Sequence, residues 1–504
     1  MKRAVPAPST QVMVRSLPVL LVALALAGCA STGVDATLHD TARQVAERTG
    51  ARPTWPATGE AAVAEPSAAS PSPASPSAAP STDPATGLPA NLPADLPPNR
   101  AEGPIDIETA VRIAFTRNAR VRETLAELGL GLADLDAASR LHNPGISLSR
   151  LTATRGGEQV TTGVTLGVTD LLLLPARRQM AATDLVRVQQ RVADAFLQLR
   201  LDVERAWVGY VAARQLAGMR ALLATSAEQS ATLAQRFRDA GNINALQLAQ
   251  ARAEAAEARS EADHAEMDAA RARLQLAAVM GVAVDGTWQA PPGLPAVPDA
   301  AVDAEVDVAS LLPRATTQRP DVLAAQAAVR LRADALDLVR RWRWLGEVEV
   351  GYEREGEPEG GALRGPTLAF ALPVFDQGQP AIARARAELL AAQAHADERA
   401  LAARNEVLTA AAELRLARSI AQRYQKDLLP ARAAVVARTQ EEVNFMLAGV
   451  FELMHARRAE FVAQQRYVEG VRDYWLARAA LRAAVGGPLA DRENEHEPDA
   501  EDGR

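Results

Sequence analysis

The chain has 504 residues, of which 48% are hydrophobic but only 4% are aromatic, and its formal net charge is −7. This mild negative charge, with no basic stripe interleaved with aromatic residues, argues against nucleic acid as a partner. Few aromatic residues and abundant alanine favour narrow, elongated helix packing over a thick globular core.

The N-terminal segment has the features of a bacterial lipoprotein signal. Basic residues precede an apolar run at residues 19–26, which leads into the sequence Leu-Ala-Gly-Cys29. Cys29 is the only cysteine, so it can form neither an internal disulfide nor a thiolate-rich metal site. We expect residues 1–29 to be a signal peptide and Cys29 to be lipidated, with Met13 as an alternative start to Met1. The alternative interpretation is that Cys29 is an incidental small residue at a cleavage site.

Residues 30–104 are predicted to be a linker. From about Ala51 the sequence consists mainly of alanine, proline and serine. Such a segment cannot bury enough apolar surface to offset the entropy lost on ordering. We therefore predict an extended tether that carries no chemistry.

The first structured unit is predicted to span residues 105–281 and begins with a helix that Asp106 caps. Asn143-Pro144 ends this helix, and two alternating segments then predict strands at residues 145–151 and 160–168. No proline occurs between Pro175 and Pro291. Apolar residues there follow steps of three and four, which is the pattern of a coiled-coil seam.

This seam predicts a long antiparallel helical hairpin with one break. The break falls at residues 237–244, where Gly241 can adopt a positive φ and Asn244 can cap the returning helix. At about 1.5 Å per residue the ascending helix spans close to 100 Å. The returning helix is predicted to end at Gly281.

Residues 282–318 are predicted to be a connector with a short helix near residues 306–312, and residues 319–487 are predicted to be a second unit. Its first strand alternates between an apolar face and an acidic face. The apolar face carries Val348, Val350 and Tyr352, and the acidic face carries Glu347, Glu349 and Glu353. The next strand places Leu368, Phe370 and Leu372 on the apolar side. We predict that the apolar side contacts lipid and that the three glutamates face water.

A second helical hairpin follows these strands. Pro430 lies inside its ascending helix and is expected to kink or divide it. Gly449 marks the predicted tip, and the returning helix ends near Gly486. Residues 488–504 are acidic and lack an apolar period, so they are predicted to be disordered.

The two units are a tandem duplication. Four landmarks of the first unit reappear in the second at offsets of roughly 200 residues: the start of the helix before the strands, the second strand, the tip and the final Gly. Four strands cannot close a barrel, because about eight is the practical minimum and lipid does not tolerate open edges. The predicted fold is therefore mainly α-helical with membrane β-strands. Three copies would give a shared 12-stranded barrel.

The order of elements, the duplication, and the sequences RPDVLAAQAAV (319–329) and LPVFDQGQPAIARA (372–385) resemble the TolC-type outer-membrane efflux proteins. The resemblance covers roughly residues 105–487. It implies a lipid-anchored homotrimer with a barrel in the lipid of the bacterial outer membrane and a helical tunnel through the periplasm. It also implies two partners, a periplasmic adaptor (membrane fusion) protein and an inner-membrane efflux pump.

The resemblance assigns adaptor docking to the tips, with Gly241 and Asn244 at the first and Gly449 and Glu452 at the second. Gln250 and His455 stand where the family commonly has Asp, so the resemblance implies an acidic constriction that is either weak here or formed by Glu452 alone.

Three other functional classes compete with the channel. The six histidines lie far apart without metal-ligand spacing, and there is no Gly-rich phosphate loop or nucleophile elbow, so we expect no enzyme, no metal site and no cofactor. A lipid-anchored periplasmic adaptor would have one hairpin and globular β domains. A structural coiled-coil protein would not need four alternating strands.

The substrate is left open between heavy-metal cations, such as copper, and drugs or solvents. The glutamates of the acidic strand face favour cations, and the second tip with its returning helix is similar to branches associated with copper and other heavy-metal export.

Overall fold

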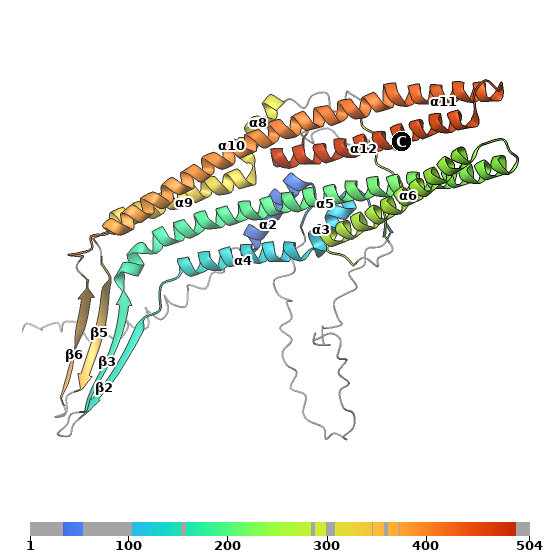
Figure 1. Cartoon of the computed structure of the whole chain (residues 1–504). Helices are drawn as coiled ribbons and strands as arrows, with labels where there is room; N and C mark the ends of the chain where they lie inside the picture. Colours follow the sequence, from blue (N-terminus) through green and yellow to red (C-terminus); the bar gives the residue numbers. More distant parts are fainter. Residues whose placement is uncertain are drawn as a thin grey trace, which may run out of the picture.

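A computed structural model of the chain describes residues 34–53, 103–152, 158–283, 288–298, 308–344, 346–356, 361–371 and 373–489. Figure 1 shows an elongated molecule with a four-stranded sheet at one end and two helical hairpins extending from it. The tips of both hairpins lie at the end opposite to the sheet. Cys29, the strand-end residue Leu372 and the tail 490–504 lie outside the described residues.

The first repeat contains four major helices and two strands. They are α3 (Ile107–Arg117), α4 (Ala119–Ser139), β2 (Gly145–Thr152), β3 (Glu158–Gly167), α5 (Val168–Asp239) and α6 (Ala245–Met280). Helix α5 alone has 72 residues, which corresponds to about 108 Å at 1.5 Å per residue. The predicted strand pair and long hairpin are therefore both present.

The second repeat has the same order of elements. It comprises α8 (Val308–Gln318), α9 (Pro320–Trp342), β5 (Val348–Gly356), β6 (Ala362–Phe370), α10 (Gln379–Arg423), the π-helix η1 (Tyr424–Leu428), α11 (Leu429–Asn444) and α12 (Val450–Val485). Pro430 lies in the first turn of α11, directly after η1, so the predicted division of this helix is confirmed. The short strands β1 (Gly103–Pro104) and β4 (Trp288–Gln289) pair in parallel.

The four long strands form one antiparallel sheet in the order β2-β3-β5-β6. The inner pair, β3 and β5, joins the two repeats, with Val164 opposite Tyr352. A side chain reinforces this junction, because the hydroxyl of Thr169 accepts a hydrogen bond from Val348 N at 2.8 Å and donates one to Gly346 O at 3.1 Å. The two hairpins are thus held together at the sheet by backbone pairing.

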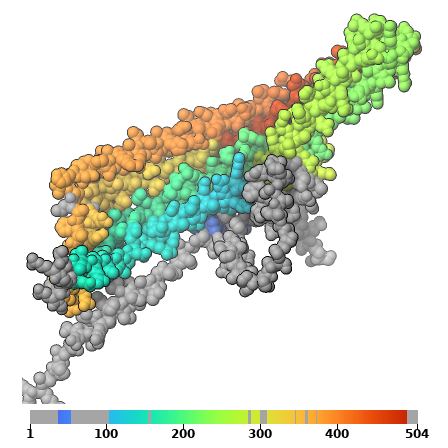
Figure 2. Space-filling model, turned by 60° about the horizontal axis from the view of Figure 1, so that its bottom comes forward, coloured from blue at the N-terminus to red at the C-terminus, as the bar shows by residue number. Residues whose placement is uncertain are grey.

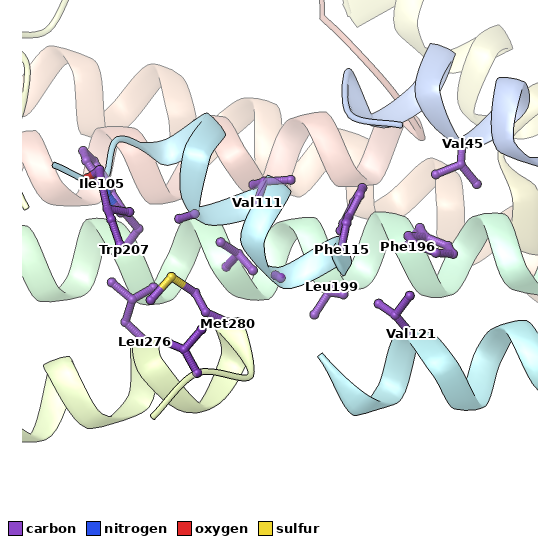
Figure 3. Packing of buried hydrophobic residues seen from close by; sticks show 14 of the residues in the cluster. Val45, Ile105, Val111, Phe115, Val121, Phe196, Leu199, Trp207, Leu276 and Met280 are labelled. Atoms are coloured by element: carbon purple, nitrogen blue, oxygen red, sulfur yellow. Dashed lines mark hydrogen bonds between the residues drawn. The ribbon is translucent and has the colours of Figure 1, made fainter. Parts of the chain in front are cut away.

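The main hydrophobic core lies around the middle of α5, where α3, α4 and the end of α6 pack against it. Figure 3 shows Phe115 of α3 beside Phe196 of α5, and their rings meet edge to face with centroids 5.0 Å apart. Trp207 Nε1 donates a hydrogen bond to Ile105 O at 3.1 Å. Val45, from a helix that precedes the repeats, completes this core.

The duplication extends to the joint that closes each hairpin. In the first repeat the Asn118 side chain caps α4 and donates to Val279 O at 2.6 Å. In the second, Arg319 precedes α9 and donates from Nη1 to Ala484 O at 3.3 Å. Each joint contacts a glycine with a positive φ. A Cβ added to Gly281 (φ +70°) would press on Asn118, and a Cβ added to Gly486 (φ +82°) would press on Arg319.

Two sequence expectations are corrected by the fold. Residues 34–49, inside the predicted linker, form helix α2 (Val34–Thr49), which packs on α5. Val45 of this helix is fully buried in the main core, and polar contacts such as Arg48 Nη1 to Gln318 O at 2.5 Å also hold the helix. The helix expected from residue 105 to 143 is divided at Asn118, because this residue ends α3 and caps α4.

Candidate functional site

Near the helices one face of the sheet is apolar and the other polar, whereas farther out the apolar face also carries Arg150, Arg354 and Arg364. Ile146, Val164, Val350, Leu368 and Phe370 share the apolar face, as the strand register shows. Their exposed fractions run from 44% for Val350 to 82% for Ile146. The predicted alternation on β5 and β6 is therefore confirmed for the described residues, and it continues across β2 and β3.

The opposite face carries mainly serine, threonine, glycine and glutamate, with Leu151 and Leu363 at the end far from the helices. Glu349 lies beside Ala369 and Glu353 beside Gly365, away from the apolar side chains. Glu347 precedes β5, and its carbonyl accepts a hydrogen bond from Ala371 N at 3.2 Å. The predicted separation of Glu349 and Glu353 from the apolar residues thus follows from the register. That this face lines water is a proposal.

Both outer strands of the sheet, β2 and β6, have one unpaired edge within the described chain. Unpaired backbone N–H and C=O groups in lipid would each be left without a partner, at a cost of several kcal/mol. A chain that puts this sheet into a membrane therefore requires further strands on both sides.

The first tip lies between α5 and α6, and Figure 2 shows it projecting at one end of the molecule. Gly241 has φ +78°, and an added Cβ would meet nothing within 4 Å. Asn244 forms a capping box, in which its side chain accepts from Gln247 N at 2.8 Å while Gln247 Oε1 accepts from Asn244 N at 3.0 Å. The predicted positive φ of Gly241 and the predicted cap at Asn244 are both confirmed.

The second tip, between α11 and α12, is built differently. Gly449 has an extended conformation (φ −82°, ψ 154°) and open space at its Cβ, so nothing in the fold requires glycine there. The residue with positive φ is Met446, at +59°. The turn thus occupies residues 445–449, so it begins slightly before the predicted tip at Gly449. A left-handed methionine is rare, so the sequence offered no signal for it.

Glu452 lies in the first turn of α12, next to this second tip, and is exposed. Arg458, further along α12, lies 3.9 Å from Glu254 and 3.7 Å from Glu257 of α6. These pairs link the two hairpins near their tips. Sequence reasoning missed them because the partners are roughly 200 residues apart.

A buried charge network connects helix α2 to both repeats near the middle of the long helix α5. The Arg200 side chain is 5% exposed and contacts Glu108 Oε1 at 2.5 Å and Glu204 Oε1 at 2.7 Å. Arg200 also donates to Thr49 O at the end of α2. Glu204, 1% exposed, pairs in turn with Arg482 of α12. Each buried charge therefore has a partner, as burial requires.

A second charged cluster joins α5 to the second repeat. Asp321 contacts Arg319 at 2.8 Å and Arg399 at 2.6 Å, and Arg319 also pairs with Glu406. Half-buried Asp194 of α5 faces this cluster. Burial, followed by the nearby charge of Asp321, raises the pKa of the Asp194 carboxyl, although Arg319 and Arg399 act in the opposite direction.

No group of three or more histidine, cysteine, aspartate or glutamate side chains in the described ranges could hold a metal ion. Among the helices of the same ranges, none is long and apolar enough to cross a membrane.

No protein-family model matches the chain, and no curated protein sequence matches it significantly. Solved structures do match. A membrane protein from Pseudomonas aeruginosa aligns with a TM-score of 0.64 at 18% identity, covering 77% of this chain and 92% of that one. CusC, described as forming a transmembrane channel, aligns with a TM-score of 0.62 at 16% identity, and the alignment covers 82% of this chain and 99% of CusC.

The outer membrane protein VceC from Vibrio cholerae aligns with a TM-score of 0.62 at 14% identity, and the alignment covers 76% of this chain and 97% of VceC. Each of these structures is matched over nearly its whole length. At such low identity the alignments establish a shared architecture. The chain therefore has the fold of the TolC-type outer-membrane channels.

Proposed function

We propose that this chain is the outer-membrane channel of a tripartite efflux system. One observation carries the proposal: a sheet with an exposed apolar face is joined at one end to two long helical hairpins whose tips lie together at the other end. A sheet that enters lipid and helices that cross an aqueous space need this division of the molecule. Neither an enzyme nor a periplasmic adaptor needs such a division.

The active form in this proposal is a homotrimer with a 12-stranded barrel. Two features support it, the unpaired strand edges and a row of exposed leucines on α10. Leu390, Leu401 and Leu408 are 67%, 59% and 41% exposed, and their spacing puts them on one side of the helix. An apolar row of this kind on a single chain favours burial against another copy.

Trimer formation is tested with Leu401→Glu, which puts a charge into the proposed contact. The expected result is loss of the heat-modifiable trimer from outer-membrane fractions. The control is Leu222→Glu on α5, which is 71% exposed, lies outside this row and should leave the trimer intact. A wild-type monomer released by washing would contradict the proposal.

The channel is further proposed to be anchored through an acylated Cys29 and to receive substrate through a periplasmic adaptor and an inner-membrane pump at its tips. Cys29→Ser should abolish incorporation of labelled palmitate. Equal labelling of the mutant would exclude the anchor without affecting the channel.

The exported substrates are proposed to be small toxic solutes. The glutamates on the polar sheet face favour cations, among them heavy-metal ions such as copper, over neutral drugs and solvents. A deletion strain should then be sensitised to copper more than to drugs or solvents. The reverse ranking would assign the channel to drug or solvent efflux.

A further inference from the structure

The four connections between the sheet and the helices lie at one level of the molecule. The strand register places Gly145 opposite Thr165, Gly167 opposite Glu349 and Val348 opposite Phe370, so the strand ends nearest the helices are neighbours. We call the described residues within 136–144, 168–178, 337–347 and 371–386 the junction band. It lies directly beside the apolar sheet face.

Large apolar side chains in the junction band are open to solvent. Phe375 is 100% exposed, Trp344 is 55% exposed, and Leu141 and Leu171 are 51% and 52% exposed. They come from four different connections, so each connection at this end of the sheet contributes one. Tryptophan and other aromatic residues at this position are typical of a membrane–water interface.

The same band is rich in arginine. Its basic side chains other than His142 are Arg140, Arg177, Arg178, Arg340, Arg341, Arg343, Arg384 and Arg386, and its carboxylates are the fewer Asp136, Asp170, Asp337, Glu347 and Asp376. The band therefore carries a net positive charge on a chain whose overall charge is negative.

Several of these arginines are not neutralised within the described chain. Arg178, Arg340 and Arg386 are exposed, and no ion pair to another described residue involves them. The Arg343 guanidinium lies 4.8 Å from the ring centroid of Trp344, so a cation and an amphipathic aromatic ring lie together in the band. An anion bound beside these exposed guanidinium groups would neutralise their charge.

We propose that the junction band binds the anionic headgroups of phospholipids in the membrane leaflet that faces the helices. The inference rests on the proposed function, because the apolar sheet face must lie in hydrocarbon for the band to reach headgroup level. Guanidinium groups then bind lipid phosphates through paired N–H donors, while Trp344 and Phe375 insert between the headgroups. The occupant is a lipid because apolar and cationic groups occur together.

The test uses the full chain reconstituted into phosphatidylcholine vesicles that contain spin-labelled phosphatidylglycerol or spin-labelled phosphatidylcholine. The measurement is the motionally restricted fraction of each labelled lipid. Wild type is expected to prefer phosphatidylglycerol at least fivefold, equivalent to about 1 kcal/mol for one basic residue at a membrane surface. High salt should reduce this preference.

The variant Arg178→Gln/Arg340→Gln/Arg386→Gln should lose the preference and still insert. Its matched control is Arg404→Gln/Arg423→Gln/Arg432→Gln, which removes exposed arginines of α10 and α11 that also have no ion pair to another described residue. This control should behave as wild type.

Insertion without any lipid preference in the wild type would overturn the junction-band proposal and leave the proposed channel standing. The same holds if the triple variant keeps the preference but loses its oligomer, since the arginines would then face another copy. Failure of the wild-type sheet to insert, measured by protease protection of the strands, would overturn both.

Discussion

Single side chains set the helix ends and the contacts between the two repeats. Asp106 and Asn244 cap helices α3 and α6, and Gly241 adopts the positive φ of the turn between α5 and α6. Arg200 and Glu204 have the i, i+4 spacing of a common surface pair, yet they are buried. Their burial depends on Thr49 and Arg482, which no local pattern connects to them.

Asp194→Asn is predicted to stabilise the chain at neutral pH. Burial raises the pKa of the folded carboxyl, so between the unfolded and folded pKa values the folded state holds more protons than the unfolded state. Stability therefore falls as pH rises through this window, and the ionised carboxylate carries the full penalty above it. Asparagine removes that charge and keeps the side-chain shape.

Thermal unfolding at several pH values checks this prediction. The melting temperature of Asp194→Asn should exceed that of wild type at neutral pH, and the two should converge at acid pH. An unchanged difference across the pH range would mean that the Asp194 charge is not responsible.

Glu452→Gln is predicted to lower the cation selectivity of the reconstituted pore. Glu452 is exposed beside the second tip, and three copies brought together would hold cations and repel anions. The reversal potential in a salt gradient measures this selectivity. Selectivity and conductance equal to wild type would exclude Glu452 as the constriction but would not affect docking at the tips.

At the scale of elements, the strands and long hairpins were predictable because their periodicities are local. Alternation over eight or nine residues assigned each face, and glycine or proline marked most breaks. Helix α2 was missed because the linker was assumed to begin at residue 30, although residues 34–49 contain no proline or serine. The partners that hold this helix are also distant in sequence. The π-helix before Pro430 and the left-handed Met446 had no distinctive sequence signal.

Val350→Arg is predicted to block insertion of the sheet, whereas Glu349→Arg should be tolerated. Val350 lies on the apolar face and Glu349 on the other. An arginine at the bilayer midplane costs about 2 to 4 kcal/mol, and a trimer would bear this cost three times.

The strand register has an independent check through single cysteines at residues 349 and 350, each in a Cys29→Ser background. A water-soluble thiol reagent should modify the cysteine at 349 faster. Equal rates at both positions would contradict the assignment of the two faces.

Gly449→Trp is predicted to abolish export without affecting assembly. Its backbone is extended and its Cβ position is open, so a large side chain fits the folded chain and obstructs only an approaching partner. Gly449→Ala is the matched control and should export normally. Gly241 is less suitable, because its positive φ strains any substitution.

Export is measured as the resistance that each variant restores to a deletion strain, and trimer content as the heat-modifiable band. Normal resistance with Gly449→Trp would show that the second tip does not dock a partner closely. Loss of resistance with Gly449→Ala as well would indicate a defect in the turn itself.

At the scale of the whole molecule, the duplication explains why two hairpins of similar length lie beside one another. The repeats are joined by the β3–β5 pair at the sheet, by the Arg200 network at mid-height and by Arg458 near the tips. Sequence predicted two such units, but the pairing between them depends on tertiary contacts. The open strand edges show that the sheet of one chain is incomplete in lipid.

We propose that copies of this chain form a continuous pore through a membrane. The most direct measurement is the single-channel conductance of the purified full chain in planar lipid bilayers, with Val350→Arg as the control. We expect discrete conductance steps for wild type from a species with the mass of a trimer, and none for Val350→Arg. Stable trimers that bind the bilayer without conductance steps, under voltages of either sign, would contradict it.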